Sequence, residues 1–349
     1  KSHVNNKPRI FSNAIRVTEE KSTFKKSIFT LCDYRKNDKC PPWSIQASQM
    51  LHDNKQKTIY YENAVIKVYD IPIFYFPKLS HPDVTVDRRS GFLISSIHDS
   101  KNLGEGLTVP YFWAINKEKD FTLTNKLYAS ENPLFMGEYR QAFENSNLAL
   151  DFGYTKGYKK TSLAKASGEK NHFFSKFEKN FNYDDSENNL KIITQDVSND
   201  KYLKLYKINR ELANKDIDTL ENSLNFAHSS DDLYVGLSAS MFETLGNEYV
   251  DKYEYVLPEI TLDKNLFSDF SYGSLDLQSN IKVHNYDTNK STKFLVNNFD
   301  WGYRDINFGT GIQTKILSKV KNINYETKNV KEFKEDTTNE LHGALGFLN

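Results

Sequence analysis

The sequence predicts an all-β protein, and three observations support this prediction. Aromatic residues make up 14% of the 349 residues, with 24 Phe and 21 Tyr against only 9 Pro, and aromatic enrichment favours strands. Many segments alternate apolar and polar residues, the pattern of a strand whose two faces meet different surroundings. No stretch approaches the ~18 consecutive apolar residues that a membrane-spanning helix requires. This argues against a helical membrane protein, whereas a β-barrel with a polar lumen is compatible with the sequence.

The first part of the chain reads as a ladder of short strands. Residues 7–31 contain two of them around the charged turn TEEKS, and WSIQASQML follows at 43–51. The polar segment HDNKQ predicts a turn before the next strands, KTIYYENAVIKVY at 57–69 and IPIFYFP at 71–77. Regular turns without a long helix favour a stacked or jelly-roll β domain.

Residues 77–106 are expected to form a linker. Two prolines and three glycines within 30 residues argue against a regular element through this segment.

From Leu107 onward the predicted strands are longer and alternate more cleanly. In 148–154, 233–241 and 275–283, apolar residues occupy one face and small or polar residues the other, with Ser279 as one polar exception. A hydrated barrel lumen requires such a small or polar face, but a soluble antiparallel sandwich alternates in the same way. At roughly 20 residues per strand and connection, this region would hold on the order of a dozen strands.

Composition and motifs argue against a catalytic function and against a nucleic-acid partner. Lys+Arg and Asp+Glu are both 46, so the net charge is zero and gives no reason to expect a nucleic-acid partner. The eight His are scattered, and no catalytic, metal-binding or nucleotide-binding motif is present. We therefore expect no enzymatic activity, no metal and no cofactor.

The two cysteines, Cys32 and Cys40, flank the polar loop DYRKNDK. This spacing is not a zinc pattern. A disulfide closing the loop would contribute roughly 2–3 kcal/mol in an oxidising compartment, while free thiols or pairing with a distant cysteine remain alternatives.

Long strings around residue 90 resemble a known family. CPPWSIQA at 40–47, the run from His52 to Leu93, LTVPYFWAINKEKDFTLT at 107–124 and GEYRQAF at 137–143 occur in order. In sequence and spacing they resemble the LptD (OstA, organic solvent tolerance) family of lipopolysaccharide-assembly proteins. The resemblance is strong over about residues 29–143 and weaker but ordered to about residue 315.

The resemblance implies an architecture, a function and a set of partners. Residues 1–92 would be the C-terminal half of a periplasmic β-jelly-roll, and residues 93–349 the N-terminal half of a large antiparallel outer-membrane β-barrel. The implied function is passage of lipopolysaccharide through a lateral gate into the outer leaflet of a Gram-negative cell. The implied partners are a plug lipoprotein, a periplasmic bridge protein and outer-membrane lipid. The chain begins at Lys1 and ends on GALGFLN, and we expect it to be a fragment. Another outer-membrane barrel, such as a porin, and a soluble all-β carbohydrate-binding protein are the alternatives.

The resemblance also implies candidate site residues. Pro110 would lie in the first barrel strand and weaken closure at the gate, because proline cannot donate to a β-ladder. Many family members carry a second proline after TLT, where this chain has Asn125. The family also forms disulfides between N-terminal and far C-terminal cysteines, and its jelly-roll interior carries acyl chains. Candidate lipid contacts follow: Arg88 and Arg89 for phosphates, and Trp43, Phe74 and Phe76 for acyl chains. The simpler interpretations are ion pairs within the junction for the arginines and core packing for the aromatic residues.

Overall fold

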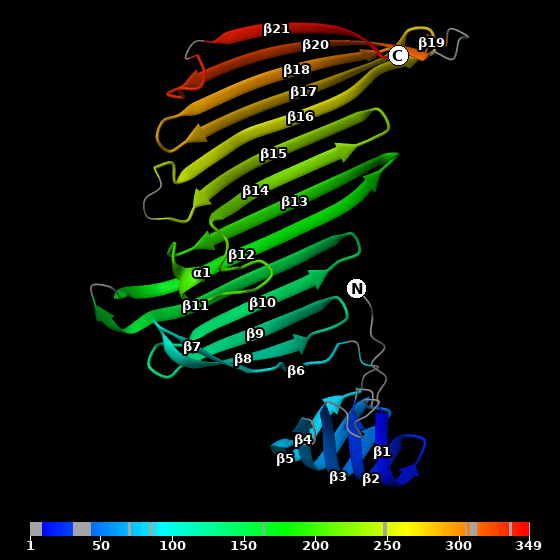
Figure 1. Cartoon of the computed structure of the whole chain (residues 1–349), viewed down its shortest axis with the longest axis vertical. Helices are drawn as coiled ribbons and strands as arrows, with labels where there is room; N and C mark the ends of the chain where they lie inside the picture. The colour runs from blue at the N-terminus through cyan, green and yellow to red at the C-terminus, as the bar shows by residue number, and fades with distance from the viewer. Residues whose placement is uncertain are drawn as a thin grey trace. The chain divides into compact units, whose positions relative to one another are not determined.

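The computed structural model describes residues 9–30, 43–68, 71–83, 86, 88–162, 165–246, 250–303, 306–307, 313–334 and 337–348. The chain divides into two compact units, Lys1–Arg89 and Ser90–Asn349 (Figure 1). Both consist of antiparallel sheets, and the described residues contain one helix, of four residues. The all-β prediction is confirmed.

The first unit is a five-stranded antiparallel sheet in sequential order, β1-β2-β3-β4-β5. The predicted hairpin and the turn at HDNKQ are both present, since β1 pairs with β2 and β3 with β4. Seven buried residues form its core: Phe29, Ile45, Ala47, Met50, Ile59, Tyr61 and Ala64. The strand bounds are Arg9–Val17, Lys21–Thr30, Trp43–Asp53, Thr58–Val68 and Ile71–Pro82.

The expected linker at 77–106 is wrong. β5 continues to Pro82, and β6 (Gly91–Phe92), β7 (Ser96–Ser100) and the start of β8 (Gly104–Ala114) lie in the same segment. β5 is an edge strand, with β4 as its partner. Prolines are tolerated there because one side of an edge strand donates no ladder hydrogen bonds.

The second unit is a sheet of 16 antiparallel strands. From β8 to β18 each strand pairs with the next in the chain, and β20 follows β18. Among the described strands, those at the two ends of the sheet do not pair with each other. Beyond β8 the strand bounds are Lys119–Tyr128 (β9), Leu134–Ala142 (β10), Ser146–Ser162 (β11), Lys165–Tyr183 (β12), Ser186–Val197 (β13), Thr219–Ser229 (β14), Leu233–Thr244 (β15), Tyr253–Asp269 (β16), Gly273–Tyr286 (β17), Ser291–Gly302 (β18), Ile306–Asn307 (β19), Gln313–Lys328 (β20) and Thr338–Leu348 (β21).

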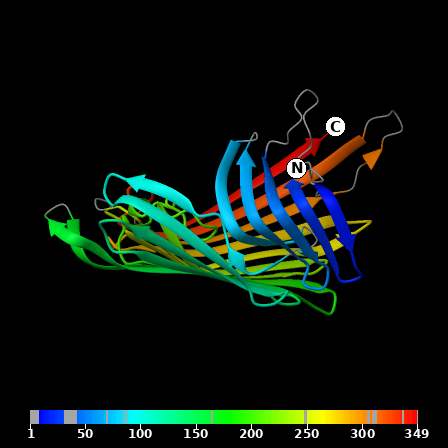
Figure 2. The same ribbon diagram turned by 90° about the horizontal axis from the view of Figure 1, so that it is seen from below.

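Strand register gathers the apolar residues of the large sheet on one face. Phe152 in β11 lies opposite Phe173 in β12, and Leu237 in β15 lies opposite Ile260 in β16. This face is exposed along the whole sheet, which curves when seen along the view of Figure 2. Its exposed members include Leu107, Tyr111, Trp113, Leu123, Phe135, Phe152, Tyr154, Phe173, Leu224, Leu237, Ile281, Leu295, Phe299, Val320, Leu341, Leu345 and Phe347. A soluble sheet buries such a face.

The connections at the two ends of the large sheet differ in length. At one end most turns are short, as at 115–118, 143–145 and 230–232, while the β18–β20 connection at 303–312 is longer. The chain enters the second unit at this end, where the Ser90 hydroxyl accepts a hydrogen bond from the backbone N–H of Ala114. At the opposite end lies the β13–β14 connection, residues 198–218.

Candidate functional site

The β13–β14 connection, residues 198–218, folds onto the polar face of the large sheet. It contains the single helical turn α1 (Tyr202–Leu205), which lies across β11 and β12 (Figure 1). Apolar residues of the connection pack against apolar residues that the strands place on this otherwise polar face. Together they form a buried cluster of Leu103, Tyr128, Leu134, Met136, Phe174, Tyr202, Leu203, Tyr206, Ile208, Ala213 and Leu220.

An ionic network lies under the connection. His172 in β12 approaches Asp151 in β11 at 2.9 Å through Nε2, and its Nδ1 lies 3.0 Å from the Tyr202 hydroxyl. Both side chains of the His172–Asp151 pair are fully buried. Arg210 of the connection contacts both oxygens of Asp151, at 3.3 and 3.2 Å, and reaches Glu138 at 3.2 Å. With its proton on Nε2, the His172 ring donates to Asp151 and accepts from the Tyr202 hydroxyl at Nδ1.

The glycine at position 153 and the protonated state of Tyr202 both suit the packing of this network. A Cβ on Gly153 would lie 2.5 Å from the His172 ring and 2.9 Å from the Tyr202 hydroxyl, so only glycine leaves room for them. Burial raises the pKa of Tyr202, and the neighbouring Tyr206 and Asp151 raise it further. Tyr202 therefore stays protonated and can donate its hydrogen bond. The network holds the connection against β10, β11 and β12.

A pocket of about 330 Å³ opens between the connection and β7–β10. Lys126 of β9 reaches into this region and donates to the backbone carbonyls of Tyr206 and Lys207, at 2.7 and 3.1 Å. Lys207 in turn reaches the carbonyl of Asp99 at 3.4 Å. These bonds hold the end of α1 against β7 and β9.

Pro110 lies in β8 at an interruption of the neighbouring ladder. On one side β8 pairs with β9, where Pro110 lies opposite Thr124. On the other side β6 pairs with residues 111–112 and β7 with residues 104–108, so β8 is not the outermost strand here. The Pro110 carbonyl accepts from the Leu93 N–H at 2.9 Å. In an antiparallel strand the N and O of one residue point the same way, so the missing donor of Pro110 faces the gap between β6 and β7.

The remaining sequence candidates lie in the first unit, where Phe74 and Phe76 lie close to each other. Arg89 donates to the Thr58 hydroxyl at the start of β4, and Arg88 is exposed. Trp43 packs on the core with its ring centroid 6.3 Å from that of Phe29. Phe74 and Phe76 lie on edge strand β5, 60% and 36% exposed, with ring centroids 6.4 Å apart. Cys32 and Cys40 lie outside the described residues.

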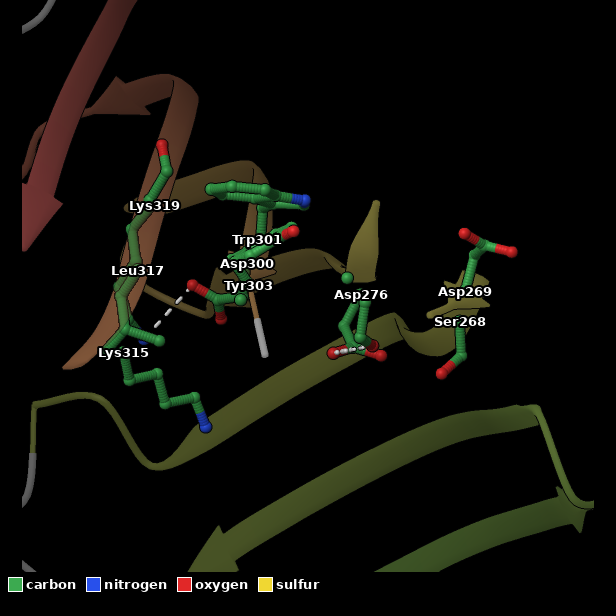
Figure 3. A pocket seen from close by; sticks show the side chains of 13 residues that line it. Ser268, Asp269, Asp276, Asp300, Trp301, Tyr303, Lys315, Leu317 and Lys319 are labelled. Atoms are coloured by element: carbon green, nitrogen blue, oxygen red, sulfur yellow. Dashed lines mark hydrogen bonds and ion pairs between the residues drawn. The ribbon is translucent and has the colours of Figure 1, made fainter. Parts of the chain in front are cut away.

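A second pocket, of about 680 Å³, lies over the ends of β16, β17, β18 and β20. Figure 3 shows Asp300 and Lys319, which form an ion pair of 3.1 Å, with Trp301 and Tyr303 nearby. Its lining mixes carboxylates, lysines and aromatic rings. This mixture selects no single class of ligand.

Two kinds of feature are absent from the described residues. No group of three or more His, Cys, Asp or Glu side chains could hold a metal ion there. No helix in that part of the chain is long and apolar enough to cross a membrane.

Comparison with known proteins identifies relatives over about a third of the chain. No protein-family model matches. The chain is 32% identical over 120 residues to the "LPS-assembly protein LptD" of Nitrosococcus oceani, which is 34% of this chain and 16% of the relative. Proteins of the same name from Legionella pneumophila and Psychrobacter cryohalolentis are 32% and 31% identical over 116 and 110 residues, 33% and 30% of this chain and 13% and 11% of theirs.

Over about a third of its length the chain is similar to proteins named LPS-assembly protein LptD. The resemblance inferred from the sequence strings is thus confirmed at the level of homology. Each matched stretch spans less than a fifth of the LptD relatives' own length.

Neither the LptD resemblance nor the residue pattern predicted the ionic network around Asp151 under the connection. Within the segment 198–218, only SNDK at 198–201 was predicted, as a polar loop. The sequence does contain a signal for this network. Asp151 and His172 are ionisable residues within strands, and Arg210 is a cation in the connection that follows them. Sequence alone does not say that these residues meet, because 21 and 59 positions separate Asp151 from its partners.

Proposed function

We propose that this chain is part of an outer-membrane protein that assembles lipopolysaccharide into the outer leaflet of a Gram-negative cell. One observation carries the proposal beyond homology: the apolar face of the 16-stranded sheet is exposed along its whole width, while the opposite face is polar. Apolar-out and polar-in is the pattern of a transmembrane barrel. It disfavours a soluble carbohydrate-binding protein, in which the apolar face would form the core.

The second unit is proposed as the N-terminal half of the barrel and the first as the C-terminal half of a periplasmic jelly-roll. The chain enters the large sheet at the end with short turns. In outer-membrane barrels short turns face the periplasm and longer loops face outward. An N-terminal unit attached at that end would be periplasmic, next to a bridge protein that delivers lipid. A plug lipoprotein would occupy the lumen.

The proposed lateral gate includes Pro110. Its missing donor faces the gap between β6 and β7, where the ladder of β8 is already interrupted. Replacing Pro110 with Val would supply a donor and strengthen closure. We expect Pro110→Val to slow lipopolysaccharide delivery, whereas Val109→Ile, one residue away, should leave it unchanged.

The lipid path in the first unit is proposed to pass Phe74 and Phe76, whose rings are exposed on β5. Arg88 and Arg89 would meet phosphates at the junction. Photo-crosslinking tests both: a probe at Phe74 should capture lipopolysaccharide, and Arg88→Ala with Arg89→Ala should lower capture near the junction. Unchanged capture in the double variant would remove the arginines from the path.

The function itself is tested by depletion. Cells depleted of the full-length protein should lose newly made lipopolysaccharide from the surface while other outer-membrane barrels remain. Antibody labelling of intact cells after a metabolic pulse measures this. Normal surface lipopolysaccharide under depletion would overturn the proposal.

A further inference from the structure

The pocket under the β13–β14 connection is lined by basic side chains. At about 330 Å³ it lies at the lower end of small-ligand sites, which span about 300–1,000 Å³. Lys126, Lys207 and Arg210 contribute to its walls, and His98 of β7 lines it as well. Among the described residues that line it there is no carboxylate.

The positive charges are only partly balanced. Arg210 is matched by Asp151 and Glu138 beneath it. Within the described residues, the hydrogen bonds of Lys126 and Lys207 go to backbone carbonyls. Carbonyl dipoles satisfy ammonium donors without cancelling their charge. Lys126 is half-buried and Lys207 is exposed. Two neighbouring cations at the wall of a partly enclosed site attract an anion.

His98 gives a second, independent indication. Its Nδ1 lies 3.2 Å from the Thr108 hydroxyl, while its Nε2 is buried without a hydrogen-bond partner in the described part of the chain. The ring lies over Gly106, where a Cβ would approach Nε2 to 2.4 Å. A buried ring nitrogen without a partner is costly unless a ligand or water satisfies it.

We propose that this pocket binds a phosphate group. Phosphate suits a site of two ammonium groups with hydroxyls nearby, because its several oxygens accept charge-assisted hydrogen bonds from different directions. Ser100 and Thr124 supply hydroxyls on the same lining. The inference that the pocket binds phosphate rests on these contacts alone. That the phosphate belongs to a glycolipid headgroup rests on the proposed function, since the pocket lies on the polar face of the sheet beside β8.

The test compares three probes on the full-length protein in detergent: inorganic phosphate, glucosamine 1-phosphate and glucosamine. Titration calorimetry and phosphorus NMR give the affinities. The key variant is Lys207→Asn, because Lys207 has φ 48° and asparagine tolerates that backbone. The matched control is Lys204→Met in the same connection, whose side chain is 56% exposed and pairs with Asp218. A second variant, Thr124→Glu, keeps both lysines and adds a carboxylate.

We expect a phosphate probe to bind the unmodified protein and the control, and glucosamine not to bind. Lys207→Asn should weaken binding by about tenfold or more, the usual effect of losing a charge-assisted hydrogen bond. Thr124→Glu should also weaken binding by about tenfold or more, because the added carboxylate repels phosphate. Tighter binding of glucosamine 1-phosphate assigns a sugar-phosphate headgroup, and tighter binding of inorganic phosphate assigns the free ion.

Absence of binding by both phosphates, or equal binding by Lys207→Asn, would overturn the site. Surface lipopolysaccharide, measured by antibody labelling in the same strains, separates this result from the proposed function. If the protein delivers lipopolysaccharide but binds neither phosphate, only the proposed phosphate site is refuted. If it binds phosphate but has no role in delivery, only the proposed function is refuted.

Discussion

The two sheets of this chain alternate apolar and polar residues in the same way, yet they bury opposite faces. In the first unit the apolar face is the core, with Phe29 2% exposed and Met50 fully buried. In the large sheet Phe152 and Phe173 remain 42% and 44% exposed, while Asp151 and His172 on the opposite face are buried. Alternation therefore predicts that a strand has two different faces, but not which of them is inside.

What decides the difference is what covers each face. The first unit covers its apolar face with its own side chains, since Phe29 meets Trp43 and Tyr61 with ring centroids 6.3 Å away and His81 at 4.9 Å. The large sheet covers part of its polar face with the β13–β14 connection and leaves the apolar face open. Lipid is the environment that would make an open apolar face favourable.

The largest expected effect is the difference in lost stability when one phenylalanine of each sheet is replaced by alanine. Phe29→Ala should destabilise the first unit by about 3–5 kcal/mol, as for other buried Phe truncations. Phe152→Ala in the large sheet should change stability far less in detergent, because that side chain is already exposed. Denaturant unfolding followed by Trp43 fluorescence, for the first unit, and by circular dichroism, for the large sheet, measures both. Equal losses would remove the contrast between the sheets.

Removing Arg210 tests the buried polar face. Arg210→Met keeps the apolar stem but leaves Asp151 buried without its cation, and breaking such a pair costs about 3–5 kcal/mol. We expect the connection to detach, with faster proteolysis between residues 198 and 218. Lys215→Met, which removes an exposed lysine paired with Asp216 in the same connection, is the control. Protection unchanged in Arg210→Met would mean that the network does not hold the connection.

A charge placed on each face of one strand sharpens the comparison in a bilayer. Leu237→Arg on the exposed apolar face of β15 should destabilise the folded protein by about 2–4 kcal/mol in lipid vesicles. Ser238→Arg, on the polar face one residue away, should cost much less. Unfolding titrations from vesicles give the two values, and the reverse order would contradict the assignment of faces.

The smallest effect concerns acid stability of the first unit. Asp53 accepts hydrogen bonds from the backbone N–H groups of Gln56 and Lys55, at 2.8 and 3.1 Å, and closes the β3–β4 turn. The Gln56 bond, with Lys21 nearby, holds the pKa of Asp53 below its usual 3.8 despite opposing desolvation. Because the folded pKa is the lower one, this stabilisation is present above about pH 4 and is lost as pH falls through the folded value. Trp43-monitored unfolding between pH 2 and 6 should show a weaker pH dependence in Asp53→Asn.

The features of the fold that depend on neighbouring residues were predicted from the sequence. Strand alternation, the hairpin at TEEKS and the turn at HDNKQ are decided by neighbouring residues, and they were found. The end of β5 beyond Pro77 was missed because Pro77 and Pro82 suggest a linker, whereas an edge strand tolerates them. Strand β7 was missed because it lies within the same expected linker. The fold of the β13–β14 connection was missed because it depends on contacts such as Arg210 to Asp151, which no local pattern encodes.

The central claim is that the apolar face of the large sheet contacts lipid, and Trp113 tests it most directly. Trp113 lies on that face and is 52% exposed, whereas Trp43 packs on the core of the first unit. Full-length variants with either residue as the single tryptophan would be folded into vesicles of lipids brominated on the acyl chains. We expect strong quenching of Trp113 and little quenching of Trp43. Equal, weak quenching of both in the folded protein would contradict the claim.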